Sequence, residues 1–231
     1  MFTLLSLQAD SLTAATSTAV IENVAPNTEI SVLEFILKGG FFLIPIAILL
    51  LYTFYVIAER YLYIDRDSKI DDRLLRDVGE QLQSGNIELA RAIVERSTNA
   101  SSTIIKEGIL VIGRPIAEIE SNMDRAADIE IGQMEKHLGH LGLIAGIAPT
   151  LGFIGTISGV IKIFYSISVT ENISIGNISG GLYEKMISSG AGLIVGIIAY
   201  SAYHLLNGKI DNFALKVQKQ ILEFVNIIQR A

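Results

Sequence analysis

Apolar residues run almost without interruption through three stretches of this chain, and charged residues return between and after them. The first stretch is Phe41–Ala58, the second is Leu138–Ile167 and the third is Met186–Leu206. A helix needs about twenty mostly apolar residues to cross the hydrocarbon core of a bilayer. The pattern therefore predicts three membrane-spanning helices.

Between the first and second stretches, apolar residues recur at helical spacing among charged ones. Leu74, Val78 and Leu82 form one such stripe, which Gly85 ends, and two similar stripes follow before residue 113. We predict that these short helices pack on a long helix that begins after Pro115. No stop signal separates that helix from the second apolar stretch, so we expect one uninterrupted helix of about fifty residues.

These patterns predict an all-α protein whose long helices extend from the membrane into a helical domain. We expect a flexible leader at 1–30 and an amphipathic tail helix at the C-terminus. The predicted divisions are the leader 1–30, a short amphipathic helix with the first span 31–62, a charged helical domain 63–137, the second span 138–167, a loop 168–180, the third span 181–207 and the tail helix 208–231.

Composition agrees with a membrane protein that also has a water-exposed part. The chain has 231 residues, of which 50% are hydrophobic and 18% charged, with a mean hydropathy of +0.47. The net charge of −6 argues against nucleic acid as a partner, and the lack of cysteine excludes disulfides and Cys-ligated metal. Because no catalytic set, phosphate loop or metal-ligand set occurs, we predict no enzymatic activity, no cofactor and no metal site.

Cations are concentrated in two segments and thereby predict the orientation. Ten of the 18 Lys and Arg residues lie in 66–136 and four in 209–230. The segment before the first apolar stretch has only Lys38, and the loop after the second span has none before Lys185. The positive-inside rule then places the N-terminus outside and the charged domain with the tail in the cytoplasm.

Small and hydroxylated residues, in place of carboxylates, punctuate the last two spans. Glycines let helices approach closely in lipid, and a proline frees a carbonyl and kinks its helix. We assign helix kink and packing to Pro149, Gly152, Gly155, Gly159, Gly192 and Gly196. For Pro149 a tolerated kink without a function is an equal alternative, and the Gly155–Gly159 spacing alone is a weak signal.

Four hydroxyls and one acid are candidates for a polar path. A hydroxyl both donates and accepts, so it can order water or face a proton carrier, although each can instead bond back to its own helix. Acids at membrane depth are usually functional, but an acid near the outer end of a span can also face water or pair with Lys185 or Lys162. The candidates are Thr150, Thr156, Ser188, Ser189 and Glu184.

These residues, taken in order, resemble a known family. The run Ile147–Phe164 resembles the second-span signature of the ExbB/TolQ/MotA proton-channel family, and Gly181–Tyr203 resembles its third span. Three shorter motifs resemble the ExbB branch, and the likeness extends over nearly the whole chain beyond residue 31. The motifs are Lys38-Gly39-Gly40, Glu59-Arg60-Tyr61 and Gly113-Arg114-Pro115.

The resemblance implies a homopentamer in the inner membrane of a Gram-negative bacterium. It also implies a single-span, ExbD-like partner that supplies an intramembrane Asp, and a TonB-like protein that the complex energises from the proton-motive force. Many family members carry Thr where this chain has Ile147 and Ser189, whereas Glu184 matches the family's third-span acid. The alternatives are a TolQ-like role in envelope constriction, a motility motor, and a membrane scaffold that conducts no ions.

Overall fold

Every element of secondary structure that the computed structural model describes, in residues 41–170 and 175–230, is an α-helix. The prediction of an all-α chain is therefore confirmed for these residues. The predicted leader 1–30 and the short helix expected before the first span lie outside them. The described helices are α3 (Leu43–Asp67), α4 (Asp72–Gln83), α5 (Ile87–Glu95), α6 (Ala100–Leu110), α7 (Ile116–Glu135), α8 (Leu138–Thr170) and α9 (Ile175–Arg230).

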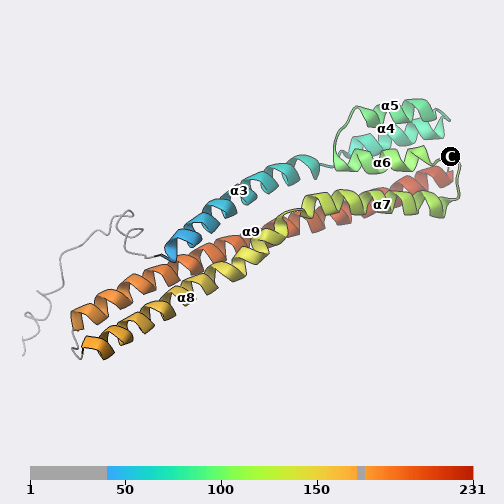
Figure 1. Ribbon diagram of the computed structural model, residues 1–231. Helices are drawn as coiled ribbons and strands as arrows, with labels where there is room; N and C mark the ends of the chain where they lie inside the picture. The colour runs from blue at the N-terminus through green and yellow to red at the C-terminus, as the bar shows by residue number, and fades with distance from the viewer. Residues whose placement is uncertain (1–40, 171–174, 231) are drawn as a thin grey trace, which may run out of the picture. The chain divides into compact units, whose positions relative to one another are not determined.

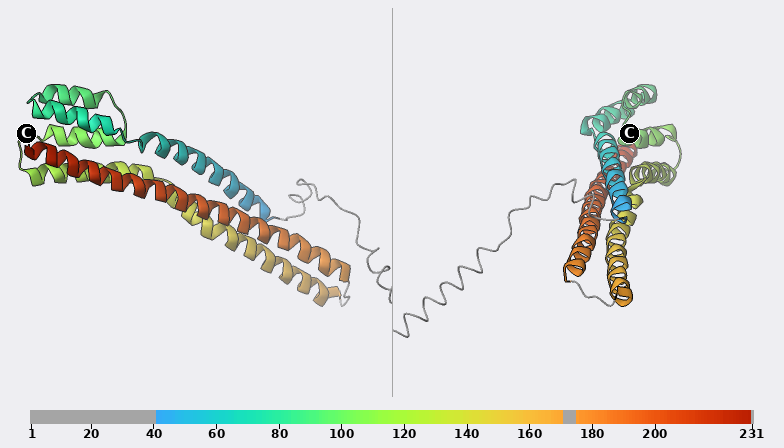
Figure 2. Two further views of the ribbon diagram at one scale, coloured as in Figure 1. Left: turned by 180° about the vertical axis from the view of Figure 1, so that it is seen from behind. Right: turned by 60° about the vertical axis from the view of Figure 1, so that its left-hand side comes forward.

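The two longest helices, α8 with 33 residues and α9 with 56, lie side by side (Figures 1 and 2). They extend into the loop predicted at 168–180, since α8 ends at Thr170 and α9 begins at Ile175. Helix α9 also continues through Gly208, so the third span and the predicted tail helix are one element. Gly208 does not end the helix, because a glycine inside a helix costs only about 1 kcal/mol relative to alanine.

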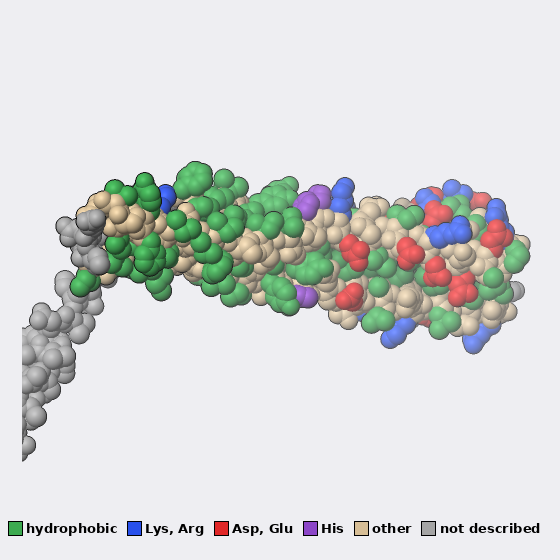
Figure 3. Space-filling view, turned by 60° about the horizontal axis from the view of Figure 1, so that its bottom comes forward, with side chains coloured by type: hydrophobic (Ala, Val, Ile, Leu, Met, Phe, Trp, Pro, Cys, Tyr) green, Lys and Arg blue, Asp and Glu red, His purple; other side chains and the backbone are tan. Residues whose placement is uncertain are grey.

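Three helical segments are long and apolar enough to cross a membrane, which confirms three candidate spans. Figure 3 shows mainly apolar side chains over the left-hand part of this face and charged side chains over the right-hand part, with histidines between them. The chain is therefore a multi-pass membrane protein in which long helices leave the bilayer and continue into a charged helical domain.

The charged helical domain consists of α4 to α7 and the part of α9 after Gly208. Its interior is apolar and includes Val78 of α4, Met123 of α7 and Phe224 of α9, each with none of its surface exposed. Gly85 ends the turn after α4 with a φ of +75°, a backbone conformation that favours glycine. Helices α4 and α6, formed by the first and third stripes, thus pack on α9 and α7, whereas α5, formed by the second, packs on α4 and α6.

Apolar packing, and not ion pairing, holds this domain together. Burying one side chain the size of Val or Phe contributes about 1.5–3 kcal/mol. The Arg114–Glu118 ion pair spans 2.8 Å, but both side chains are about half exposed, and such a pair contributes about 0.5 kcal/mol. In Glu95, hydrogen bonding from Arg91 lowers the pKa of the carboxyl group, but both side chains lie at the surface.

The prediction of one uninterrupted helix from Ile116 into the second span is wrong. Helix α7 ends at Glu135 and α8 begins at Leu138. Between them Lys136 has an extended ψ of 135°, and His137 has a φ of +68°. Among the described residues, His137 is the only non-glycine residue with a positive φ. Neither a glycine nor a proline occupies this position to indicate the end of a helix.

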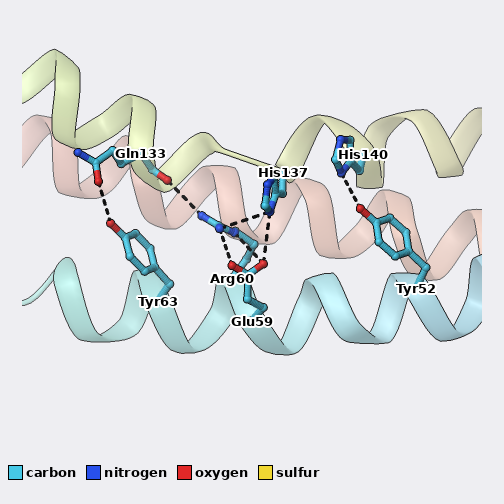
Figure 4. A network of polar contacts seen from close by, with 7 residues as sticks. All are labelled: Tyr52, Glu59, Arg60, Tyr63, Gln133, His137 and His140. Carbon is cyan, nitrogen blue, oxygen red and sulfur yellow. Dashed lines mark hydrogen bonds and ion pairs between the residues drawn. The ribbon is translucent and has the colours of Figure 1, made fainter.

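Arg60 of α3 binds the carbonyl that this break leaves free. In a continuous helix the Gln133 carbonyl would accept from the His137 N–H, but here Arg60 Nη1 donates to it over 3.1 Å. Arg60 is 5% exposed and also pairs with Glu59, whose carboxylate lies 3.5 Å from His137 Nδ1 (Figure 4). Helix α3 continues past Glu59–Arg60 to Asp67 and is longer than the span predicted from apolar residues.

Replacing Arg60 with Met is expected to lower the stability of the protein by about 2 kcal/mol. The change keeps most of the apolar stem but leaves the Gln133 carbonyl and the Glu59 carboxylate without the guanidinium. Thermal unfolding of the purified protein in detergent measures the loss. Arg66→Met is the matched control, because the Arg66 side chain is 79% exposed, and equal melting temperatures for the two variants would contradict the role of Arg60.

Candidate functional site

Six residues were assigned to helix kink and packing, and the five glycines among them lie in the contact between α8 and α9. Gly152, Gly155 and Gly159 lie on the face of α8 that meets α9, and Gly192 and Gly196 lie on the opposing face of α9. Their spacing of three or four residues places them on one stripe of each helix. With only hydrogen atoms on Cα, the two backbones approach as small residues allow in membranes.

A side chain at two of these glycines, Gly152 and Gly192, would collide with backbone atoms of the other helix. A Cβ on Gly192 would lie under 3.0 Å from the Ala148 carbonyl oxygen, and one on Gly152 would lie 3.0 Å from the Ser188 carbonyl oxygen. Backbone atoms cannot move aside as a flexible side chain can. The helices therefore depend on glycine at these two positions for their separation.

Pro149 is placed in the same contact. Its ring lacks the N–H that would bond to the Ala145 carbonyl, and that carbonyl faces Gly196, where a Cβ would lie 3.1 Å from its oxygen. Helix α8 nevertheless runs as one element from Leu138 to Thr170 with the proline inside it. Gly196 thus makes room for both the proline ring and the free carbonyl.

Two of the predicted hydroxyls lie within this contact. Thr156 Oγ1 donates across the helices to the Lys185 carbonyl over 3.1 Å, besides lying 3.3 Å from the Gly152 carbonyl of its own helix. Ser188 is 1% exposed, and its hydroxyl has no hydrogen-bond partner among the described residues. A buried hydroxyl without a partner costs about 1–3 kcal/mol, which sets Ser188 apart from the other hydroxyls.

The other two hydroxyls are not enclosed between α8 and α9 as Ser188 is. Thr150 is exposed and its Oγ1 donates back to the Ile147 carbonyl over 2.7 Å. It is two residues from Gly152, about 200° around the helix, so it faces away from α9. Ser189 is half-buried at the contact, where its Cα lies next to Gly152. In a single copy, therefore, Thr150 and Ser189 do not meet.

Charged groups near the outer ends of the spans were the remaining candidates. The side chain of Glu184 lies outside the described residues. The stem of Lys185 passes so close to Gly159 that a Cβ there would collide with it, whereas Lys162 is exposed. Among the described side chains, no group of three His, Asp or Glu residues could hold a metal ion.

Sequence reasoning missed the residues that the glycines contact. Ala145 and Ala148 supply the backbone oxygens that face α9, and Ala148 is completely buried. Ala148 lies four residues before Gly152, so an extended search for small residues at this spacing would have found it. The packing of the Lys185 stem against Gly159 could not be predicted from residue spacing, because a lysine at a membrane interface normally extends toward water.

Comparison with known proteins identifies the family to which this multi-pass membrane protein belongs. A family model described as the MotA/TolQ/ExbB proton channel family matches residues 88–219. The chain is 30% identical over 189 residues to a putative biopolymer transport protein, ExbB homolog, of Methanothermobacter thermautotrophicus, covering 81% of this chain and 67% of the relative. The chain therefore belongs to the MotA/TolQ/ExbB proton channel family.

Two further relatives carry the names of two branches. The TolQ protein of the Tol-Pal system of Haemophilus influenzae is 27% identical over 108 residues, which cover 47% of each chain. The biopolymer transport protein ExbB of Pseudomonas putida is 22% identical over 142 residues, which cover 62% of this chain and 41% of the relative.

Gly192→Ala is expected to destabilise the protein by about 1–3 kcal/mol, because the new methyl group forces the backbones of α8 and α9 apart at Ala148. Gly190→Ala is the matched control: it lies two residues away in the same helix, and a Cβ there meets nothing within 4 Å. Thermal unfolding of the two purified variants measures the difference. If both variants melt at the same temperature, the close contact does not determine the helix separation.

Proposed function

We propose that this chain is the larger membrane subunit of a proton-driven motor that energises TonB-dependent transport across an outer membrane. In this proposal five copies surround a single-span, ExbD-like partner, and a TonB-like protein receives the energy. The family match over 88–219, which includes all of α8 and the whole apolar part of α9, carries the proposal. The ExbB names of two of the relatives above favour this branch of the family.

In this proposal the partner supplies the carboxylate that titrates in the middle of the membrane. Neither 138–167 nor 186–206 contains Asp or Glu, and hydroxyls do not ionise near neutral pH. Desolvation in a dry pore raises the free energy of a partner's carboxylate when it is charged, and much less when it is protonated. Hydroxyls around it can stabilise both forms, because each can donate and accept a hydrogen bond. Each proton that crosses releases roughly 2.3 kcal/mol per 100 mV, which can bias motion of the partner within the ring.

Helices α8 and α9 line the pore in this proposal, and α3 lies outside them. Glycines and hydroxyls are concentrated in α8 and α9, whereas α3 exposes bulky residues such as Phe54 and Tyr55. The Thr156 hydroxyl donates across the contact and Ser188 is buried in it, so the exposed Thr150 and the half-buried Ser189 are the hydroxyls that remain for a partner or a neighbouring copy.

The proposed topology has an external N-terminus and a cytoplasmic charged domain. The distribution of Lys and Arg supports it, since ten lie in 66–136 and four in 209–230. A TolQ-like role in envelope constriction is the second candidate, supported by the TolQ relative at 27% identity over 108 residues.

Proton flux into vesicles tests the proposal. The chain is co-reconstituted with a single-span partner that has an Asp in its span, and acidification of the vesicle interior is followed under an imposed potential. We expect flux only when both proteins are present and the Asp is intact, with Asp→Asn in the partner as control. Uptake through a TonB-dependent receptor, compared with rescue of constriction in cells lacking TolQ, then separates the two candidate functions. A stable complex that passes no protons would overturn the motor proposal in favour of a scaffold.

Ser189→Ala with Thr150→Val is expected to lower proton flux at least about tenfold without loss of the complex. The double variant removes the two accessible hydroxyls with little change in volume, and a hydrogen bond to a charged group contributes about 1.5–3 kcal/mol. Ser189→Thr keeps the hydroxyl and should retain flux. Flux is measured per assembled complex, and unchanged flux in the double variant would remove the hydroxyls from the mechanism.

Glu184→Gln is expected to lower proton flux, increasingly so as external pH rises, with assembly unchanged. The carboxylate near the outer end of the third span would concentrate protons there, and this matters most when protons are scarce. A weaker oligomer in native mass spectrometry with normal flux per complex would instead indicate a structural role.

A further inference from the structure

A groove between α3 and α9 lies away from the glycine contact and has no place in the proposed proton path. Its volume is about 530 Å³, within the range of roughly 300–1,000 Å³ typical of small-molecule sites. Most of its wall is apolar and comes from the facing sides of the two helices. The apolar lining residues are Ile57, Tyr61, Ala202, Leu205 and Leu206.

One end of the groove is polar and cationic. Lys209 and Asn212 line it, and the same two residues line an adjacent cavity of about 210 Å³ together with Asp65 and Lys216. Lys209 Nζ lies 3.7 Å from an Asp65 oxygen and 4.0 Å from the centre of the Tyr61 ring.

Positive charge is in excess at this end. Asp65 is the acid that faces the cavity, and it is shared, because Lys69 Nζ also lies 4.0 Å from its other oxygen. Two lysines thus share this carboxylate, and a third, Lys216, lines the same cavity. Because Lys209 is 41% exposed, its ammonium group has donors left for a further acceptor.

The groove also lies where the apolar part of α9 gives way to the charged part. The third apolar stretch ends at Leu206, and Lys209 is the next cation. A molecule that fills both halves must therefore be amphiphilic, with an apolar chain beside Leu205 and an anionic head beside Lys209.

We propose that this groove binds an anionic phospholipid from the leaflet next to the charged helical domain. One acyl chain lies along Ile57, Ala202 and Leu205, and the phosphate accepts hydrogen bonds from Lys209 Nζ and Asn212 Nδ2. A lysine is a suitable phosphate ligand as a point charge, and amphipathic side chains at this depth anchor headgroups. The site joins α3 to α9 through the lipid at the place where both helices leave the bilayer.

Native mass spectrometry with phosphatidylglycerol as the probe tests the site. The purified protein is titrated with the lipid in detergent, and bound lipids per subunit are counted. Lys209→Gln should weaken binding about tenfold, because it removes a charge-assisted hydrogen bond. Lys219→Gln is the matched control, since Lys219 lies exposed on the same helix and lines neither cavity. Ala202→Phe fills the apolar half and should abolish binding of phosphatidylglycerol and of phosphatidylcholine alike.

Three results would overturn the proposal. Equal binding by the Lys209→Gln and Lys219→Gln variants would show that Lys209 does not bind the headgroup. Unchanged binding by a folded Ala202→Phe variant would show that the lipid binds outside this groove. The third concerns a second copy of the chain as occupant. The chain has no cysteine, so Leu205→Cys introduces a single thiol, and efficient cross-linking of this thiol between copies in membranes would show that protein covers the groove.

Discussion

The close approach of two backbones, those of α8 and α9, is the constraint on which the membrane part of this protein depends. Gly192 allows the Ala148 carbonyl to approach at a distance that a Cβ would block, and Gly196 does the same for Pro149 and the free Ala145 carbonyl. In lipid there is no hydrophobic gain from burying apolar side chains against one another, so close packing and hydrogen bonds must stabilise the pair. The Thr156 hydroxyl, which donates to the Lys185 carbonyl, adds one such bond across the same contact.

Outside the lipid, different forces hold the chain together. Helices α4 to α7 bury apolar side chains against α9, which is favourable only where water is the alternative. Helix α9 is a single helix of 56 residues, so continuous backbone hydrogen bonds join its apolar part to its charged part.

Helix α8 does not continue into the charged helical domain as α9 does, because the chain breaks between α7 and α8. Between α7 and α8 the backbone turns at Lys136–His137, and Arg60 of α3 binds the Gln133 carbonyl that the turn frees. Helix α3 is thereby joined to the junction through Arg60 and Glu59, and joined to α9 through Lys209 and Asp65. One peripheral helix thus contacts both long helices near the place where the apolar surface ends.

The sequence by itself determined the all-helical class, the three apolar spans and the family, because each depends on composition or on order along the chain. The three apolar stretches are visible without a fold, and so are the stripes at Leu74–Leu82 and the ordered motif at Ile147–Phe164. It predicted that the glycines would matter for packing, but it could not separate Thr150 from Thr156, or Ser188 from Ser189. Which hydroxyl is buried depends on how α8 and α9 are rotated against each other, and that rotation is set by contacts between residues far apart in the chain. The break at His137 was likewise decided only by tertiary structure, since its freed carbonyl is satisfied by an arginine 73 residues earlier.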